Sequence, residues 1–242
     1  MAKSSKIIKS LKDLDGPIPT DEAPEIKNII TSAGIAVFPH LNSPSMPNIE
    51  GYDKGPRYST LLRLKTDDQA TQDLIELIDA VQKANIANSI KENGKSKSKD
   101  SGHVGYTEEY ERDEDNKETE DLTGYTLFNF RLDAEVFSKR KNKTYKFSPA
   151  LFDSNLQPTT VEIGGGSEIR IIFDARGWWN TSLGCGVKLT LRKVQVIQAR
   201  QGGGRDETAE GFDVVEDGFV EQGSGFEDGT ESGSGSDGAS DY

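Results

Sequence analysis

Cysteine and histidine are scarce in this chain, and their scarcity excludes several kinds of site. Cys185 is the single cysteine among 242 residues, so the chain can form neither an internal disulfide nor a multi-cysteine zinc site. The two histidines, His40 and His103, lie far apart in the sequence, which argues against a histidine-rich metal centre. We therefore expect neither a metal nor a cofactor.

Long apolar runs are also absent. No stretch of about 18 apolar residues occurs, so we expect no membrane-spanning helix. Ile7 and Ile8 follow a basic start but are too few for the core of a signal peptide. Only 33% of the residues are hydrophobic, so part of the chain should lie outside any core. These features predict a soluble intracellular protein.

Motifs for catalysis are missing as well. Residues 164–167 (GGGS) lack the Lys-Ser/Thr ending of a phosphate-binding loop and predict a tight connection between strands. Cys185 has no neighbouring histidine and is expected to be buried. We interpret His40 as structural and His103 as exposed. The sequence predicts a protein that is not an enzyme, with a nuclease or another nucleic-acid enzyme as an alternative.

Acidic charge is confined to two segments. The chain has 41 acidic and 29 basic residues, a net charge of −12. Residues 206–242 hold 12 acidic and no basic residues, and residues 107–121 hold nine acidic and two basic. The remainder has 20 acidic and 27 basic residues, a net charge of +7. Such a body is compatible with a polyanionic partner.

Alternating hydrophobicity predicts several strands. In residues 57–65 and 124–133 every second side chain is suited to a core, including Phe128 and Phe130. In residues 186–198 the alternation slips at Arg192-Lys193, which indicates a bulge. Further strands are expected at residues 31–41, 145–152, 159–163 and 168–173, the last with Phe173 in the core.

Residues 66–93 have the spacing of an amphipathic helix. Thr66 is predicted to be its N-cap and Gly94 its end. One helix among short strands predicts a mainly β fold, an OB-fold-like barrel with one packed helix, with a β-sandwich as the alternative. The predicted organisation is an N-terminal extension over residues 1–30, a barrel domain over 31–205 with a flexible charged insertion at 94–121, and a disordered acidic tail over 206–242.

Basic residues alternate with aromatic residues on the predicted strands. Cations that follow a phosphate backbone and rings that stack on unpaired bases together bind single-stranded nucleic acid. Trp178 and Trp179 should point to opposite sides, one into the core and one outward. The candidate phosphate contacts are Arg57, Arg63, Lys65, Arg131, Lys139, Arg140, Lys141, Lys146, Arg170, Arg176 and Lys188, and the candidate stacking platforms are Tyr125, Tyr145 and Trp178.

Five stretches of the chain carry a family resemblance. They read KGPRYSTLLRL, YKFSPALFDSNLQP, IGGGSEIRIIFDARGWWN, GCGVKLTLRKVQVIQ and GFDVVEDGFV. Together they resemble the single-stranded DNA-binding proteins of podovirus-type bacteriophages. The insertion at residues 107–121 is longer than this family would lead us to expect.

The resemblance implies an OB-fold core, a homodimer and a function in phage DNA replication, recombination, repair and strand annealing in the cytoplasm of the infected bacterium. It also implies that the acidic tail contacts the phage polymerase and helicase–primase, with Asp237, Asp241 and Tyr242 as candidate contacts. Because the tail is a polyanion tethered beside a basic body, we also expect it to compete with DNA. The alternative from another class is an acidic chaperone-like protein with no nucleic-acid role.

Overall fold

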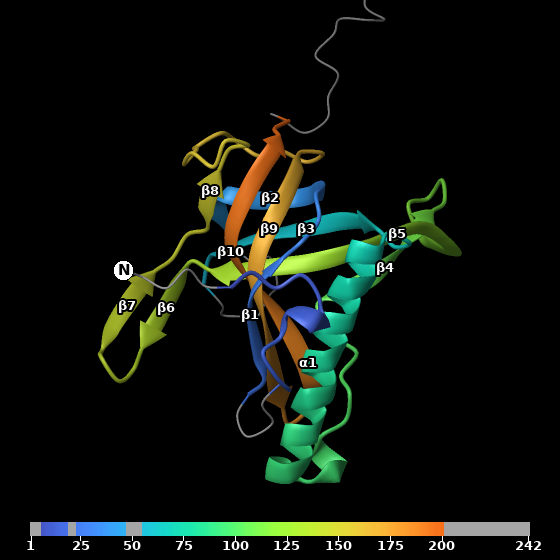
Figure 1. Ribbon diagram of the computed structural model, residues 1–242, viewed down its shortest axis with the longest axis vertical. Coiled ribbons are helices and arrows are strands. Elements are labelled where there is room, and N and C mark those ends of the chain that lie inside the picture. The colour runs from blue at the N-terminus through green and yellow to red at the C-terminus, as the bar shows by residue number, and fades with distance from the viewer. Residues whose placement is uncertain (1–5, 19–22, 47–54, 201–242) are drawn as a thin grey trace, which may run out of the picture. The chain divides into compact units, whose positions relative to one another are not determined.

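The computed structural model describes residues 6–18, 23–46 and 55–200 (Figure 1). It contains one α-helix, α1 (Gln69–Asn93), and two short 3₁₀ helices, η1 (Leu11–Asp13) and η2 (Lys95–Lys97). The strands are β1 (Glu25–Ile30), β2 (Gly34–Ser45), β3 (Arg57–Lys65), β4 (Tyr106–Arg112), β5 (Glu118–Asp133), β6 (Glu135–Ser138), β7 (Lys143–Lys146), β8 (Ala150–Phe152), β9 (Glu168–Asn180) and β10 (Gly184–Gln198).

Five strands close into a barrel. β2 pairs with β3, and β3 pairs with β5 along nine residues of each strand. β5 then pairs in parallel with β10 at Leu189 and Phe130, β10 pairs with β9, and β9 returns to β2 at Gly34 and Ile169. This closed sheet with one helix confirms the prediction of a mainly β, OB-fold-like barrel.

The alternating side chains fill the barrel as predicted. Phe128, Phe130 and Phe173 are fully buried, and the Phe130 and Phe173 rings meet edge to face at 4.8 Å. Cys185 is buried as well. The predicted bulge in the last strand is confirmed, because the β9–β10 register shifts between Leu191 and Lys193.

Helix α1 lies against β9 and β10 (Figure 1). It buries an apolar stripe that includes Leu74 and Ile78. The prediction of Thr66 as N-cap is wrong: the helix begins at Gln69 with Asp68 as its N-cap. The Thr66 hydroxyl instead lies 2.9 Å from that of Thr126, because the end of β3 keeps Thr66 beside β5. The end at Gly94, with φ of 82°, is confirmed.

Two segments that we expected to be irregular are strands. Residues Glu25–Ile30, which we placed in the N-terminal extension, form β1, an edge strand that pairs with β9. Asn28 has φ of 57° and shifts the register, so the alternation of Ile26 and Ile29 is broken and hard to detect in the sequence. Within the insertion predicted to be flexible, residues 106–112 form β4 and pair with an extended β5.

One expected strand is absent from the described part of the chain: residues 159–163 have no strand assignment. The Asn42 side chain replaces a strand partner there. Its amide donates to the Val161 carbonyl at 2.8 Å, and its oxygen accepts from the Ile163 amide at 3.0 Å. A side chain thus satisfies backbone groups that a neighbouring strand would otherwise bind.

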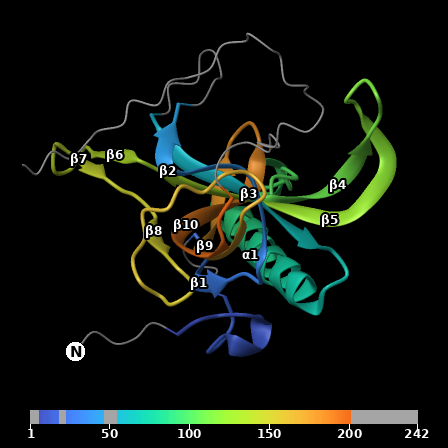
Figure 2. The same cartoon turned by 90° about the horizontal axis from the view of Figure 1, so that it is seen from above.

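Two hairpins extend from opposite sides of the barrel, as both views show (Figure 1, Figure 2). We call residues 107–122, the outer part of β4 and β5 with their turn, the acidic arm. We call residues 135–147, which comprise β6 and β7, the basic arm. β6 and β7 pair with each other and with no other described strand.

Candidate nucleic-acid interface

A groove of about 910 Å³ crosses the outer side of β5 and β10. Its floor and walls come from β3, β5, the ends of β9 and β10, and the loop before β4. That loop fills the gap between the strands, because the Asn129 amide donates to Gly105 and the Val187 amide donates to His103. Its lining includes Arg57, Leu61, His103, Leu127, Asn129, Arg131, Asp133, Trp178, Trp179, Leu183 and Lys188.

Three predicted phosphate contacts, Arg57, Arg131 and Lys188, line this groove. Lys188 is partly neutralised by Asp133, at 2.9 Å, but the pair is exposed, so solvent weakens its attraction. The Arg131 guanidinium donates to the Asn129 side chain at 2.8 Å, which holds it along β5. With one carboxylate against three cations, the groove suits an anionic ligand.

Both tryptophans line the groove. Trp178 is half-buried, and its ring lies 6.5 Å from the His103 ring in a stacked arrangement. Trp179 is exposed, and its indole donates to the Lys97 carbonyl at 2.9 Å. The prediction that one tryptophan is a core residue is therefore wrong: they stand at the end of β9, where the chain leaves the barrel interior.

A second hollow of about 340 Å³ continues the groove across β3 to β2. The two share Arg57, Leu61, Asn129 and Arg131 as lining residues. Its far wall contains Phe38, His40 and Met46, none of which we proposed for binding. Phe38 is 76% exposed although alternation from Ala36 would bury it, because φ of 48° and a shifted register turn it outward. No local pattern in the sequence indicates this reversal.

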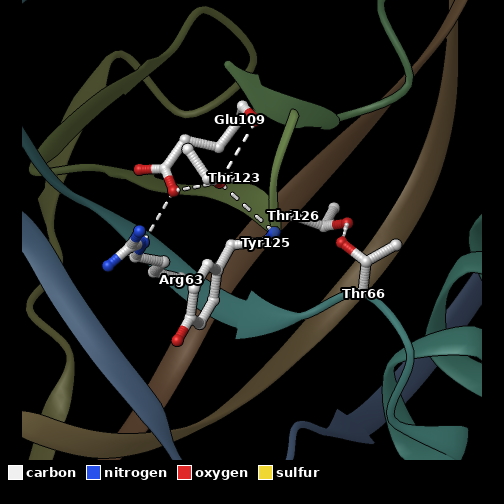
Figure 3. Close-up of polar contacts among 6 residues, drawn as sticks. All are labelled: Arg63, Thr66, Glu109, Thr123, Tyr125 and Thr126. Atoms are coloured by element: carbon white, nitrogen blue, oxygen red, sulfur yellow. Dashed lines mark hydrogen bonds and ion pairs between the residues drawn. The ribbon is translucent and has the colours of Figure 1, made fainter. Parts of the chain in front are cut away.

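Arg63 and Tyr125, predicted for phosphate contact and stacking, contact each other (Figure 3). The Arg63 guanidinium carbon lies 3.9 Å from the Tyr125 ring centroid, and its Nε donates to Glu109 at 2.7 Å. The Thr123 hydroxyl donates to the same carboxylate at 2.7 Å. This network attaches the acidic arm to the barrel and covers one face of the Tyr125 ring.

The other predicted contacts lie outside the groove lining. Lys139, Arg140, Lys141, Tyr145 and Lys146 are on the basic arm, where Lys141 and Lys143 approach the Tyr145 ring. Lys65 is exposed at the end of β3, and Arg170 and Arg176 are on β9. Arg176 on β9 is the register partner of Lys188 on β10, and this pairing places Arg176 beside the groove. For all of them, contact with DNA stays a prediction.

The wall formed by the loop before β4 is attached to helix α1 through Tyr106. The Tyr106 hydroxyl donates to Asp79 at 2.8 Å, and its ring packs against Phe128. Burial and the bond to Asp79 together raise the pKa of Tyr106 above its ordinary value. The phenol is therefore neutral at physiological pH and can donate this bond.

Among the residues that the structure describes, no group of three or more His, Cys, Asp or Glu side chains could hold a metal ion. None of the described helices is both long and apolar enough to cross a membrane. Asp237, Asp241 and Tyr242, predicted to contact partners, lie in the tail outside the described residues.

Comparison with known proteins shows that the chain is similar to two phage proteins. The chain is 33% identical over 106 residues to the single-stranded DNA-binding protein of Escherichia phage T7, and 35% identical over 101 residues to that of Enterobacteria phage T3. Over these segments the chain is similar to phage single-stranded DNA-binding proteins. These matches span 42% and 39% of the chain and 44% and 42% of the relatives, less than half of each protein. No family model matches the chain.

The fold agrees with this relationship. The crystal structure of gp2.5, a single-stranded DNA-binding protein encoded by bacteriophage T7, superposes with a TM-score of 0.58 at 20% identity. The superposition covers 81% of this chain and 100% of that one. The phage relatives are named for binding DNA and not for a reaction, which agrees with the prediction that the chain is not an enzyme.

Proposed function

We propose that this protein binds single-stranded DNA without sequence preference. The observation that carries the proposal is the groove, in which Arg57, Arg131 and Lys188 lie beside the two tryptophan rings. Cations can follow a phosphate backbone while the rings stack on bases of any sequence. Duplex DNA offers no unstacked base to these rings, so single strands should be preferred.

The single DNA strand would cross the barrel from Trp178, over β5 and β3, to Phe38 on β2. This path follows the groove and the hollow that continues it. Both ends then offer an aromatic ring, and the cations shared by the two hollows, Arg57 and Arg131, lie between them. Such a path supports stacking at the ends and phosphate contact in the middle.

Binding to a mixed-sequence oligonucleotide of about 16 nucleotides tests the proposal, because an OB fold covers about 4–16 nucleotides. If about four to six phosphates are contacted, log K should fall against log salt with a slope of about −3 to −4. The matched duplex should bind more weakly. Equal affinity for the duplex, or a slope near zero, would contradict the proposal.

We further propose that the protein acts in replication, recombination, repair and strand annealing of phage DNA, in the cytoplasm of the infected bacterium and as a homodimer. In this proposal Asp206–Tyr242, with 12 acidic and no basic residues, occupies the groove without DNA and reaches the phage polymerase and helicase–primase when DNA displaces it. A tethered segment competes at an effective concentration of the order of millimolar.

Deletion of Asp206–Tyr242 tests this mechanism. The truncated chain should bind single-stranded DNA more tightly at low salt, and the gain should shrink as salt screens the competition. Binding to the two partner proteins should be lost. Unchanged affinity at low salt would exclude competition, while unchanged partner binding would exclude recruitment by the tail.

A further inference from the structure

The basic arm is an unpartnered sheet. Its two strands pair with each other alone, and none of its side chains belongs to the described hydrophobic core. An isolated two-stranded hairpin is marginally stable in water. Nevertheless the arm exposes large apolar side chains: Val136 is 45% exposed, Phe137 56% and Phe147 44%. Val136 and Phe137 are consecutive and point to opposite faces of the ribbon, so both faces carry exposed apolar surface, which indicates that another molecule covers the arm.

Charge indicates what covers it. Five basic residues and one acidic residue give the basic arm a net charge of +4. The acidic residue, Glu135, approaches Lys146 at 3.5 Å. Within the described residues, no carboxylate pairs with Lys139, Arg140, Lys141 or Lys143. The arm therefore needs a partner that is acidic and also offers exposed apolar groups.

The acidic arm has both properties. It holds nine acidic and two basic residues, a net charge of −7. Tyr110 and Leu122 are paired across its strands and are 37% and 51% exposed, so they form an apolar spot among carboxylates. Residues 118–122 of β5 pair with β4 and not with β3, so the tip of the arm extends beyond its attachment to the barrel at Glu109.

The two arms of one molecule cannot meet, since they extend from opposite sides of the barrel (Figure 1, Figure 2). We infer that the acidic arm of one molecule docks on the basic arm of a second copy of this chain. Different surfaces meet in this contact, so a pair of molecules keeps one acidic and one basic arm free, and association proceeds head to tail. Such a row would place successive barrels along one DNA strand.

Charge reversal in the full-length chain tests the inference without DNA, so the result does not depend on the proposed DNA binding. The first variant carries Glu111→Lys, Glu114→Lys and Glu120→Lys, which add six charges and bring the acidic arm from −7 to −1. The second carries Lys139→Glu, Arg140→Glu and Lys141→Glu, which bring the basic arm from +4 to −2. The control carries Glu76→Lys, Glu92→Lys and Glu162→Lys, the same change at exposed positions outside both arms.

Sedimentation velocity should show that the wild-type chain and the control assemble beyond a dimer at low salt, and that the assemblies dissociate in high salt. Neither arm variant alone should assemble beyond the proposed homodimer. In an equimolar mixture the two variants should associate with each other, because the intact acidic arm of the second docks on the intact basic arm of the first. The other pairings either repel or keep only the small attraction between arms of −1 and +4. The inference is overturned if the wild-type chain does not assemble, if either variant assembles like the wild type, or if the mixture forms no complex. Assembly that survives reversal of the acidic arm alone would indicate that the acidic tail occupies the basic arm.

Discussion

Trp178 lies directly over Gly186 on the neighbouring strand, in a place that a side chain would fill. The two residues are partners in the β9–β10 register, and a Cβ added at Gly186 would overlap the indole ring and the His103 carbonyl. The absence of a side chain at this position lets the ring lie in the groove beside the loop wall. The Trp178 ring is therefore positioned by its strand partner.

We expect Gly186→Ala to weaken binding of single-stranded DNA, because the ring or the wall must move. Trp178→Ala should weaken it about 5- to 150-fold, corresponding to about 1–3 kcal/mol for one stacked base. Fluorescence titration with the oligonucleotide measures both. Gly165→Ala is the matched control, since a Cβ there meets nothing within 4 Å. If Gly186→Ala binds like the wild type, the ring does not depend on this position.

Arg57 and Arg131 should contribute equally to the salt dependence. Each contacts about one phosphate in our proposal, so Arg57→Ala or Arg131→Ala should make the slope of log K against log salt about 0.7 less negative. Lys83→Ala, an exposed cation on helix α1, is the control and should leave the slope unchanged. A slope that does not change in Arg57→Ala would place the DNA away from β3.

Phe38 should be exchangeable for glycine without loss of stability. Its φ of 48° is unfavourable for a residue with a side chain but favourable for glycine, and the ring is largely exposed. In Phe38→Gly we expect an unchanged or higher free energy of unfolding, together with lower affinity for single-stranded DNA. Chemical denaturation and oligonucleotide titration measure the two effects. Lower stability with unchanged affinity would show that Phe38 is structural.

Tyr106 should make stability depend on pH in the alkaline range. The pKa of the folded phenol is above the ordinary value of 10.0 expected in the unfolded chain. The stabilisation is therefore complete below pH 10 and is lost as the pH rises toward the folded pKa. Chemical denaturation at several pH values should show that the free energy of unfolding declines above pH 10. This decline should be smaller in Tyr106→Phe. An identical decline in both proteins would exclude Tyr106 as its source.

Local patterns in the sequence were sufficient to predict the strands that bury only one of their two faces. In β3 and β5 every second residue is core-forming, because successive side chains of a strand point to opposite sides. The slip at Arg192-Lys193 predicted the bulge in the same way. β4 was missed because its outer part has no buried face and therefore no alternation, and β1 was missed because Asn28 interrupts it.

The chemical character of the site could also be predicted: Arg57, Arg131, Lys188 and Trp178 do line one groove. Which of the fourteen candidates come together was decided by barrel closure, since β3, β5, β9 and β10 are distant in sequence and meet only through pairing. The β3–β5 pairing also placed Arg63 on Tyr125, and the fold holds the acidic and basic arms on opposite sides of the barrel. A sequence records the order and chemistry of side chains, but the distance between two strands depends on long-range hydrogen bonds that no local pattern contains.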